Sequence, residues 1–381
     1  MVMKNSTNKC KHHIVRNVIV GALLSASATT IFAGDTIKIA IVGPATGQLA
    51  QFGEMQSVGA KMAIEQLNKS GQFAGKTLVA VPYDDACDPK QAVAVANKVV
   101  NDGIKFVVGH VCSSSTQPAS DIYEDEGVLM ITAASTNPEI TNRGYKLLFR
   151  TIGLDNAQAP IASKYILEHI KPKSIAIIHD KQQYGEGIAS EVKRNLELQG
   201  QSVAMFEGIN AGDKDYSAII SKIKRQNIDL VYFGGYHPEL GLILRQSRER
   251  GVNAKFMSTE AAGNKELTAI AGSAAEGLSV TLPKAFDEDP ANQSLVQAFK
   301  DAKADPSGIF VLPAYAAVQV LAKSISDAAS TDVEKVAATI RGESFNTPIG
   351  TLQFDEKGDL KNFSFVVYDW HADGTKTLAT Q

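Results

Sequence analysis

The chain lacks most of the residues and motifs by which many functions are recognised. It contains three cysteines and one tryptophan in 381 residues, and no pair of cysteines or histidines has the spacing of a zinc site. Phosphate-binding glycine loops, nucleophile elbows and Ser/His/Asp arrangements are also missing, so nothing favours catalysis, and we expect no cofactor and no metal. The formal net charge of -3 argues against a nucleic-acid partner.

The apolar stretch near the N-terminus is too short to cross a membrane. It runs from Val18 to Leu24, follows basic residues up to Arg16 and precedes small residues up to Ala33. This order is typical of a secretory signal peptide, whereas a membrane span needs about 20 apolar residues. We therefore expect residues 1–33 to be removed on export, with cleavage after Ala33 preferred over Ala28.

Export would leave two cysteines, Cys87 and Cys112, in the mature chain. In an oxidising compartment such a pair is most simply a disulfide, and the alternative is two free buried thiols. A bond between them would close a loop of 26 residues. By the chain-entropy argument this would stabilise the fold by roughly 3 to 4 kcal/mol. Cys10 precedes the apolar stretch, which argues against a lipid anchor at a cysteine.

Short β-branched runs alternate with longer stretches of helical periodicity along almost the whole mature chain. This alternation predicts an α/β fold with doubly wound parallel sheets and helices on both faces. The expected strands include Ile37–Val42, Leu78–Tyr83, Phe106–Gly109, Leu129–Thr132, Ser174–His179, Asp229–Gly234 and Gly277–Val280. Helices are expected between them, for example over Phe52–Ser70 and from Pro89.

The alternation lapses after about Pro283, so the last third is expected to complete the earlier units. Helical segments cover Ala291–Lys303, Val311–Ala329 and Asp332–Arg341, and strands follow near Thr351 and Phe363. The pattern favours two sheets, each finished by the returning chain. The candidate crossings between them are Arg150–Asp155, Leu282–Lys284 and Lys361–Phe365.

Residues just past the strands form the candidate site, because ligands bind at the carboxyl ends of strands in open α/β sheets. Ser113–Thr116 opens a helix, where hydroxyls and free N–H groups can hold an anion. The loop Thr132–Pro138 offers hydroxyls and carbonyls, Gly234–Glu239 presents Tyr236, and Glu260 suits an ammonium group. Taken singly, each has an ordinary explanation: a helix cap, a solvated loop, a core tyrosine and a surface glutamate.

Three further motifs are expected to be structural only. The acidic clusters Asp84–Asp88 and Asp355–Asp359 lack the spacing of a calcium loop, and we expect a turn with a helix start and a hairpin turn. Gly185–Gly187 lacks the third glycine of a dinucleotide fingerprint and lies well past its strand.

Four segments taken together closely resemble the periplasmic leucine/isoleucine/valine-binding proteins. They are Tyr83–Pro89, Gly109–Pro118, His179–Gly185 and Gly234–Pro238. The likeness covers essentially the whole mature chain. It implies the type I periplasmic binding protein fold, with two lobes joined by three crossover strands. The N-terminal lobe would comprise residues 34–153 plus 284–363, and the C-terminal lobe residues 154–283 plus 364–381.

The resemblance also implies an α-amino acid ligand held between the lobes. In the family, the serine matching Ser113 and the main chain at Thr136 hold the carboxylate, helped by the tyrosine matching Tyr236. The ammonium group goes to the carbonyl of Ala134, the Thr136 hydroxyl and Glu260. Ser135 replaces a family alanine and adds a hydroxyl to this ligand-binding loop.

The side-chain pocket implied by the resemblance is apolar and suits an aliphatic group. Phe52 stands where relatives carry tyrosine or tryptophan, so the ranking of leucine, isoleucine and valine stays open. The implied pocket residues are Phe52, Val111, Cys112, Tyr184 and Phe310.

We therefore expect a monomeric periplasmic receptor, not embedded in the membrane, that delivers branched-chain L-amino acids to the permease of an ABC importer. It would bind its ligand without transforming it. One alternative is a receptor for another small neutral amino acid or an amide, in transport or sensing. A more distant alternative is an exported enzyme that uses carboxylates or Tyr184 for acid/base chemistry.

Overall fold

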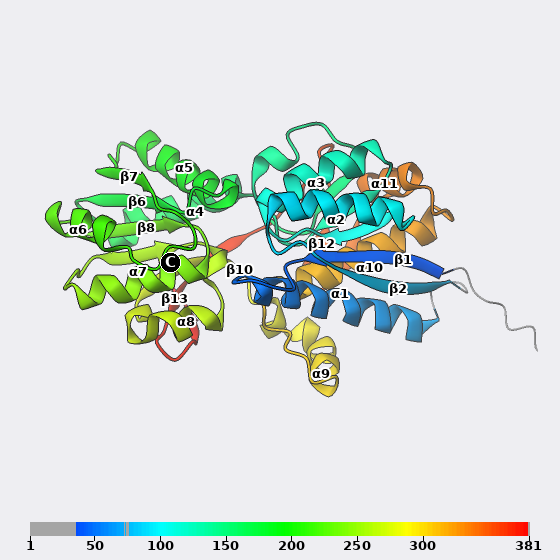
Figure 1. Ribbon diagram of the computed structural model, residues 1–381. Coiled ribbons are helices and arrows are strands. Elements are labelled where there is room, and N and C mark those ends of the chain that lie inside the picture. The colour runs from blue at the N-terminus through cyan, green and yellow to red at the C-terminus, as the bar shows by residue number, and fades with distance from the viewer. Residues whose placement is uncertain (1–35, 72, 74–75, 380–381) are drawn as a thin grey trace, which may run out of the picture. The chain divides into compact units, whose positions relative to one another are not determined.

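The structure is a computed structural model that describes residues 36–71, 73 and 76–379. The predicted signal peptide, residues 1–33, lies outside these residues, as do both candidate cleavage positions. No helix in the described ranges is long and apolar enough to span a membrane. Two large sheets, drawn in Figure 1, organise the described residues.

The first sheet has five parallel strands in the order β2-β1-β3-β4-β5. Its strands are β1 Thr36–Gly43, β2 Thr77–Asp84, β3 Phe106–Gly109, β4 Leu129–Thr132 and β5 Leu148–Arg150. The second sheet has seven strands in the order β14-β13-β10-β9-β8-β6-β7. Its strands are β6 Ile175–His179, β7 Met205–Gly208, β8 Leu230–Gly234, β9 Lys255–Ser258, β10 Leu278–Pro283, β13 Phe365–Trp370 and β14 Lys376–Leu378. A separate hairpin pairs β11 Phe345–Thr347 with β12 Gly350–Leu352.

The helices follow the predicted alternation. Those of the first half are α1 Ala50–Ser70, α2 Pro89–Asn101, α3 Ser113–Asp125, α4 Asp155–Tyr165 and α5 Gln183–Leu198. Those of the second half are α6 Ser217–Arg225, α7 His237–Glu249, α8 Lys265–Ala271, α9 Gln293–Asp301, α10 Val311–Asp327 and α11 Val333–Gly342. The predicted α/β fold with parallel-sheet cores is confirmed.

Helices cover both faces of the first sheet (Figure 1). Alternate residues of β1 point to opposite faces, as in any strand. Ile37, Ile39 and Ile41 pack into the core that contains residues of α1 and α10, whereas Ala40 and Val42 pack with residues of α2 and α3. The late helix α10 therefore completes the first sheet, and we call the elements packed on this sheet the first lobe and those packed on the other the second lobe.

The second sheet is not fully parallel, which corrects the expectation. β13 runs antiparallel to β10, with Pro283 paired to Phe365, and β14 runs antiparallel to β13. The chain leaves the second sheet after β10 and returns to it at the same end as β13. Two neighbouring strands joined in this way must run in opposite directions.

The acidic clusters have the structural roles expected of them. The Asp88 carboxylate accepts hydrogen bonds from the N–H groups of Lys90 and Gln91 and so caps α2. Asp355 and Asp359 form a hairpin turn, in which the Asp355 N–H donates to the Asp359 carbonyl at 2.8 Å. In the part of the chain that the structure describes, no group of three or more His, Cys, Asp or Glu residues has a metal-binding arrangement.

Candidate functional site

The start of α3 carries buried hydroxyls that do not cap the helix. Cys112 occupies the cap position, and its side chain makes no cap hydrogen bond. The hydroxyls of Ser113 and Ser115 are buried, and no described residue lies within hydrogen-bond range of either. Buried polar groups are normally paired, so these hydroxyls point to a group that the protein itself does not supply. The positive end of the helix dipole favours an anion there.

A disulfide and a buried polar pair fix the loop that leads into α3. Cys87 and Cys112 are bonded, with 5.5 Å between their Cα atoms, as predicted. Beside this bond, the Asp85 carboxylate accepts a hydrogen bond from the Cys87 N–H at 2.9 Å. Its other oxygen lies 2.6 Å from His110 Nδ1, and both side chains are fully buried. The loop before α3 is thus held from the ends of both β2 and β3.

The loop after β4 lies against the same helix start. The Thr132 hydroxyl donates to the His110 carbonyl at 2.7 Å. Ser135 lies 2.5 Å from the Thr116 hydroxyl and donates to the Val111 carbonyl at 2.9 Å. The Ser135 hydroxyl is therefore engaged by the protein and ties the two loops together. Thr136 next to it is fully buried, and its hydroxyl faces the carboxyl groups of Asp155 and Glu260.

A buried arginine supports this loop from behind. Arg150, at the end of β5, is fully buried and donates to the carbonyls of Ser135 at 2.9 Å and Asn137 at 3.3 Å. Its Nε lies 2.6 Å from Asp359, and its Nη2 donates to Thr141 at 2.7 Å. Arg150 thus links the loop that carries Ala134 and Thr136 to the turn formed by the returning chain.

Carboxylates gather at the second-lobe end of the site. Glu260 follows β9 at the start of a short 3-10 helix and is 1% exposed. The amide of Gln158, on α4, donates to its Oε2 at 2.5 Å. Asp155, the first residue of α4, is also fully buried, and the Thr136 hydroxyl is a hydrogen-bonding neighbour of its carboxylate.

Burial makes both acids hard to ionise. It raises the pKa of Asp155 well above its ordinary value, and the charge of Glu260 raises it further. Burial likewise raises the pKa of Glu260, while the hydrogen bond from Gln158 opposes that rise. Two neighbouring buried carboxylates ionise together only beside a cation. This end of the site is therefore complementary to a positively charged group.

The predicted pocket residues meet in one apolar cluster. The cluster contains Phe52, Val111, Cys112, Tyr184, Tyr236 and Phe310 together with the core of the second sheet. The fully buried Phe52 ring lies 5.4 Å from Phe310, 6.2 Å from Tyr236 and 5.3 Å from His237, measured between centroids. Tyr184 donates its hydroxyl to Thr259 at 2.6 Å, so its ring is fixed beside Tyr236. An apolar, largely aromatic wall thus lies beside the hydroxyl end and the carboxylate end of the site.

Direct contacts join the first lobe to the second beside this cluster. The Asn137 amide donates to the Gln183 carbonyl at 3.0 Å, and the Gln183 side chain donates to Gln117 of α3. A Cβ on Gly187 would collide with the Asn137 amide, so this glycine permits the close approach.

The sequence of residues 36–375 matches the family described as periplasmic binding protein. This chain belongs to that family. It is 62% identical over 375 residues to the leucine-, isoleucine-, valine-, threonine- and alanine-binding protein of Pseudomonas aeruginosa, covering 98% of this chain and 99% of the relative. It is 54% identical over 362 residues to the Leu/Ile/Val-binding protein of Escherichia coli K12, covering 95% and 98%.

Solved structures agree with this periplasmic binding protein in fold. A leucine binding protein from Thermotoga maritima aligns with a TM-score of 0.84 and 28% identity, covering 90% of this chain and 98% of that one. A branched-chain amino acid substrate binding protein from Streptococcus pneumoniae, solved with isoleucine, aligns at 0.81 with 23% identity and covers 90% and 98%. The expected type I fold and the resemblance are confirmed.

Sequence reasoning missed two residues of this periplasmic binding protein's candidate site. Asp155 and Gln158 lie three positions apart on one face of α4, and α4 begins at Asp155, the last residue of a predicted crossing between the sheets. An acid in the first turn of a helix is usually explained by the helix dipole, which hides any further role. The feature that could have identified Asp155 is its position at the end of a crossing, where the start of a helix faces the other lobe.

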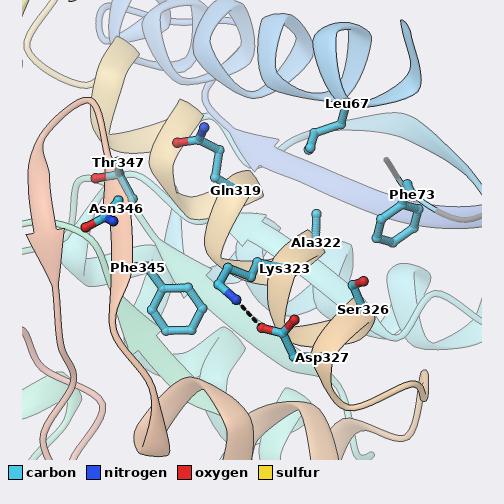
Figure 2. A pocket seen from close by; sticks show the side chains of 10 residues that line it. All are labelled: Leu67, Phe73, Gln319, Ala322, Lys323, Ser326, Asp327, Phe345, Asn346 and Thr347. Atoms are coloured by element: carbon cyan, nitrogen blue, oxygen red, sulfur yellow. Dashed lines mark hydrogen bonds and ion pairs between the residues drawn. The ribbon is translucent and has the colours of Figure 1, made fainter. Parts of the chain in front are cut away.

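Two surface hollows lie outside the candidate site. Figure 2 shows one of about 240 Å³, where side chains of α10 and β11 face Leu67 of α1 and Phe73. A larger hollow of about 710 Å³ has lining residues from α1, the Gly263–Lys265 segment and the chain before α10. Neither is lined by a predicted site residue of this periplasmic binding protein.

Proposed function

We propose that this protein is the substrate-binding component of an ABC importer and binds branched-chain L-amino acids between its two lobes. The single observation that carries the proposal is the polarity of the buried site. Unpartnered hydroxyls at a helix N-terminus form one end, two buried carboxylates form the other, and apolar side chains lie beside them. A zwitterion with an aliphatic side chain matches all three parts.

Each predicted ligand-binding residue then has a role. The Ser113 hydroxyl and the main chain at Thr136 hold the ligand carboxylate, with Tyr236 beside them. The Ala134 carbonyl, the Thr136 hydroxyl and Glu260 take the ammonium group, and Asp155 adds a second negative charge. Ser135 supports this ligand-binding loop through its hydroxyl's bonds to Thr116 and Val111.

The apolar wall sets the class of side chain. Phe52, Val111, Cys112, Tyr184 and Phe310 offer no charged group to a ligand side chain, so aliphatic amino acids are preferred. The relative from Pseudomonas aeruginosa is named for binding leucine, isoleucine, valine, threonine and alanine, which supports ligands of this size. The ligand is bound without chemical change, since the site holds it only by hydrogen bonds, ion pairs and apolar contacts.

Delivery depends on closure of the lobes around the ligand. Bound ligand touches both lobes, so it favours the closed form by its greater affinity for that form. The protein acts in the periplasm as a monomer, after removal of residues 1–33, and presents the closed form to the membrane permease. The lobe boundaries are those predicted from the sequence, residues 34–153 plus 284–363 and residues 154–283 plus 364–381.

Isothermal titration calorimetry of the mature protein tests the proposal. Bound ligand is first removed by unfolding and refolding, and leucine, isoleucine, valine, threonine, alanine and acetamide are titrated in turn. We expect saturable heat with the branched-chain amino acids and none with acetamide. Binding of acetamide alone would support the alternative amide receptor, and a product of altered mass recovered from the complex would support the exported enzyme.

A further inference from the structure

The cation-binding end of the site carries one acid more than a single ammonium group needs. Asp155 and Glu260 are both buried there, and Gln158, three residues after Asp155 on α4, donates its amide to Glu260 at 2.5 Å. The cation whose charge acts on Asp155 is Arg150, and its guanidinium is already paired with Asp359 at 2.6 Å. The ligand-free site therefore holds two carboxyl groups with no cation of their own.

The described surroundings of the pair add no unpaired positive charge. The ionisable groups that face it from the adjoining elements are phenols, one further carboxylate and the paired guanidinium. They are Tyr184 and Glu191 of α5, Tyr232 of β8, Tyr236 before α7, and Arg150 of β5. In such surroundings two buried carboxyl groups cannot both be ionised, so one of them keeps its proton.

We propose that Asp155 and Glu260 share one proton in the ligand-free protein and release it to solvent when an amino acid binds. This inference rests on the proposed function and adds a proton to its binding reaction. The ligand arrives as a zwitterion and keeps its three ammonium protons. The carboxyl O–H bond of the pair breaks, both carboxylates then accept hydrogen bonds from the ammonium group, and the proton passes to the buffer.

The charge of the site explains why release is favourable. Before binding, one protonated and one ionised acid leave a charge of one negative unit at this end. After binding, two carboxylates and one ammonium leave the same charge, so no additional charge is buried. The raised pKa values of both acids in the ligand-free protein agree with this order of events.

Proton release gives the affinity a defined pH dependence. The pair has a higher pKa in the free protein than in the complex, so affinity rises as pH rises through the range between the two. The slope of log affinity against pH equals the number of protons released, which for one proton is about tenfold per pH unit. Above the free-protein pKa the affinity becomes independent of this pair.

Calorimetry in buffers of different ionisation enthalpy measures the released proton directly. Leucine is titrated into the mature protein at the same near-neutral pH in phosphate, imidazole and Tris. The observed heat is plotted against buffer ionisation enthalpy, and the slope is the number of protons taken up by the buffer. For the wild type we expect a substantial fraction of one proton, and for Asp155→Asn a value near zero with leucine still bound.

Two further variants keep the result unambiguous. Glu260→Gln also removes one acid of the pair, so proton release falls even if Asp155→Asn folds poorly. Asp180→Asn tests the rival source of the proton, because Asp180 is a buried acid outside this pair whose pKa burial raises to about 7. It should leave the proton count unchanged.

The outcomes separate this inference from the proposed function. A slope of zero in the wild type, with leucine bound normally, overturns proton release and leaves the proposed function standing. Proton release that persists in Asp155→Asn and disappears in Asp180→Asn overturns the assignment to this pair. No heat with any branched-chain amino acid in any buffer contradicts the proposed function itself.

Discussion

The two ends of the candidate site use different chemistry for opposite charges. The end at α3 has no charged side chain; it relies on the hydroxyls of Ser113 and Ser115 and on a helix N-terminus. The end at α4 uses two formal charges, Asp155 and Glu260, buried together. Neutral, fixed donors suit an anion without any change of protonation, whereas the buried acids gain their full charge only beside a cation.

This difference indicates which end of the site contributes more binding energy and which end makes binding depend on pH. The hydroxyl end is held rigidly by the Cys87–Cys112 bond and by the Asp85–His110 pair, so it is already formed before ligand arrives. The acid end is assembled from α4 and the segment after β9. Damage to the acid end should therefore cost more affinity than comparable damage to the hydroxyl end.

The largest expected effect is from Glu260→Ala. Removing one partner of a buried ion pair costs about 3 to 5 kcal/mol, so leucine affinity should fall roughly a hundredfold or more. Calorimetry measures the loss. Glu276→Ala is the control variant and should bind leucine normally. Glu276 is an exposed acid on the side of the second sheet, and it contacts His371. An unchanged affinity for Glu260→Ala would remove Glu260 from the site.

The next largest effect tests how the hydroxyl end is held. The double variant Cys87→Ala with Cys112→Ala should lower the free energy of unfolding by roughly 3 to 4 kcal/mol, because the unfolded chain loses a closed loop. Urea unfolding, with the wild type in dithiothreitol as a parallel sample, measures this change. Equal midpoints for the variant and the oxidised wild type would show that the bond adds no stability.

Ser113→Ala should have a smaller effect on binding. It removes one hydrogen bond to a charged group, which is worth about 1.5 to 3 kcal/mol, and it leaves no buried hydroxyl unpaired. The loss should be smaller than that of Glu260→Ala. Ser115→Ala, two residues along the same helix, is the matched variant and should lose less affinity for leucine. If Ser113→Ala binds leucine more weakly than Glu260→Ala does, the comparison between the two ends is reversed.

Phe52→Tyr should give the smallest change in ligand binding. The added hydroxyl enters a site surrounded by Tyr236, His237 and Phe310, while the ring stays in place. We expect the ratio of leucine to valine affinity to change by about 1 kcal/mol or less, in line with the modest selectivity of apolar pockets. Competition between the two amino acids, measured by calorimetry, gives this ratio. A change above a hundredfold would mean that this position dominates selectivity.

The hydroxyl end could be predicted from the sequence because its residues are local. Ser113–Thr116 and Thr132–Thr136 each follow a strand directly, and the carboxyl ends of parallel strands meet at one edge of a sheet. The helix periods and the β-branched runs likewise predicted most elements of both sheets. Short strands such as β5 and β14 were missed, since three residues carry too little pattern.

The acid end could be predicted only in part. Glu260 is predicted by its position and by the resemblance, but Asp155 lies 105 residues before it. Their proximity depends on how the chain crosses between the sheets and on Gln158, which contacts Glu260 from α4. The direction of β13 depends on the same crossings. Long-range closure of this kind leaves no periodic signal in the chain.

The position of Phe52 has a consequence for the timing of recognition. This ring belongs to α1, yet two of its neighbours, Tyr236 and His237, come from the other lobe. A ligand that first contacts one lobe alone therefore contacts only part of the apolar wall that selects its side chain. We expect leucine and its smaller analogues to arrive at similar rates and to differ in how long they stay, so discrimination resides in the dissociation rate.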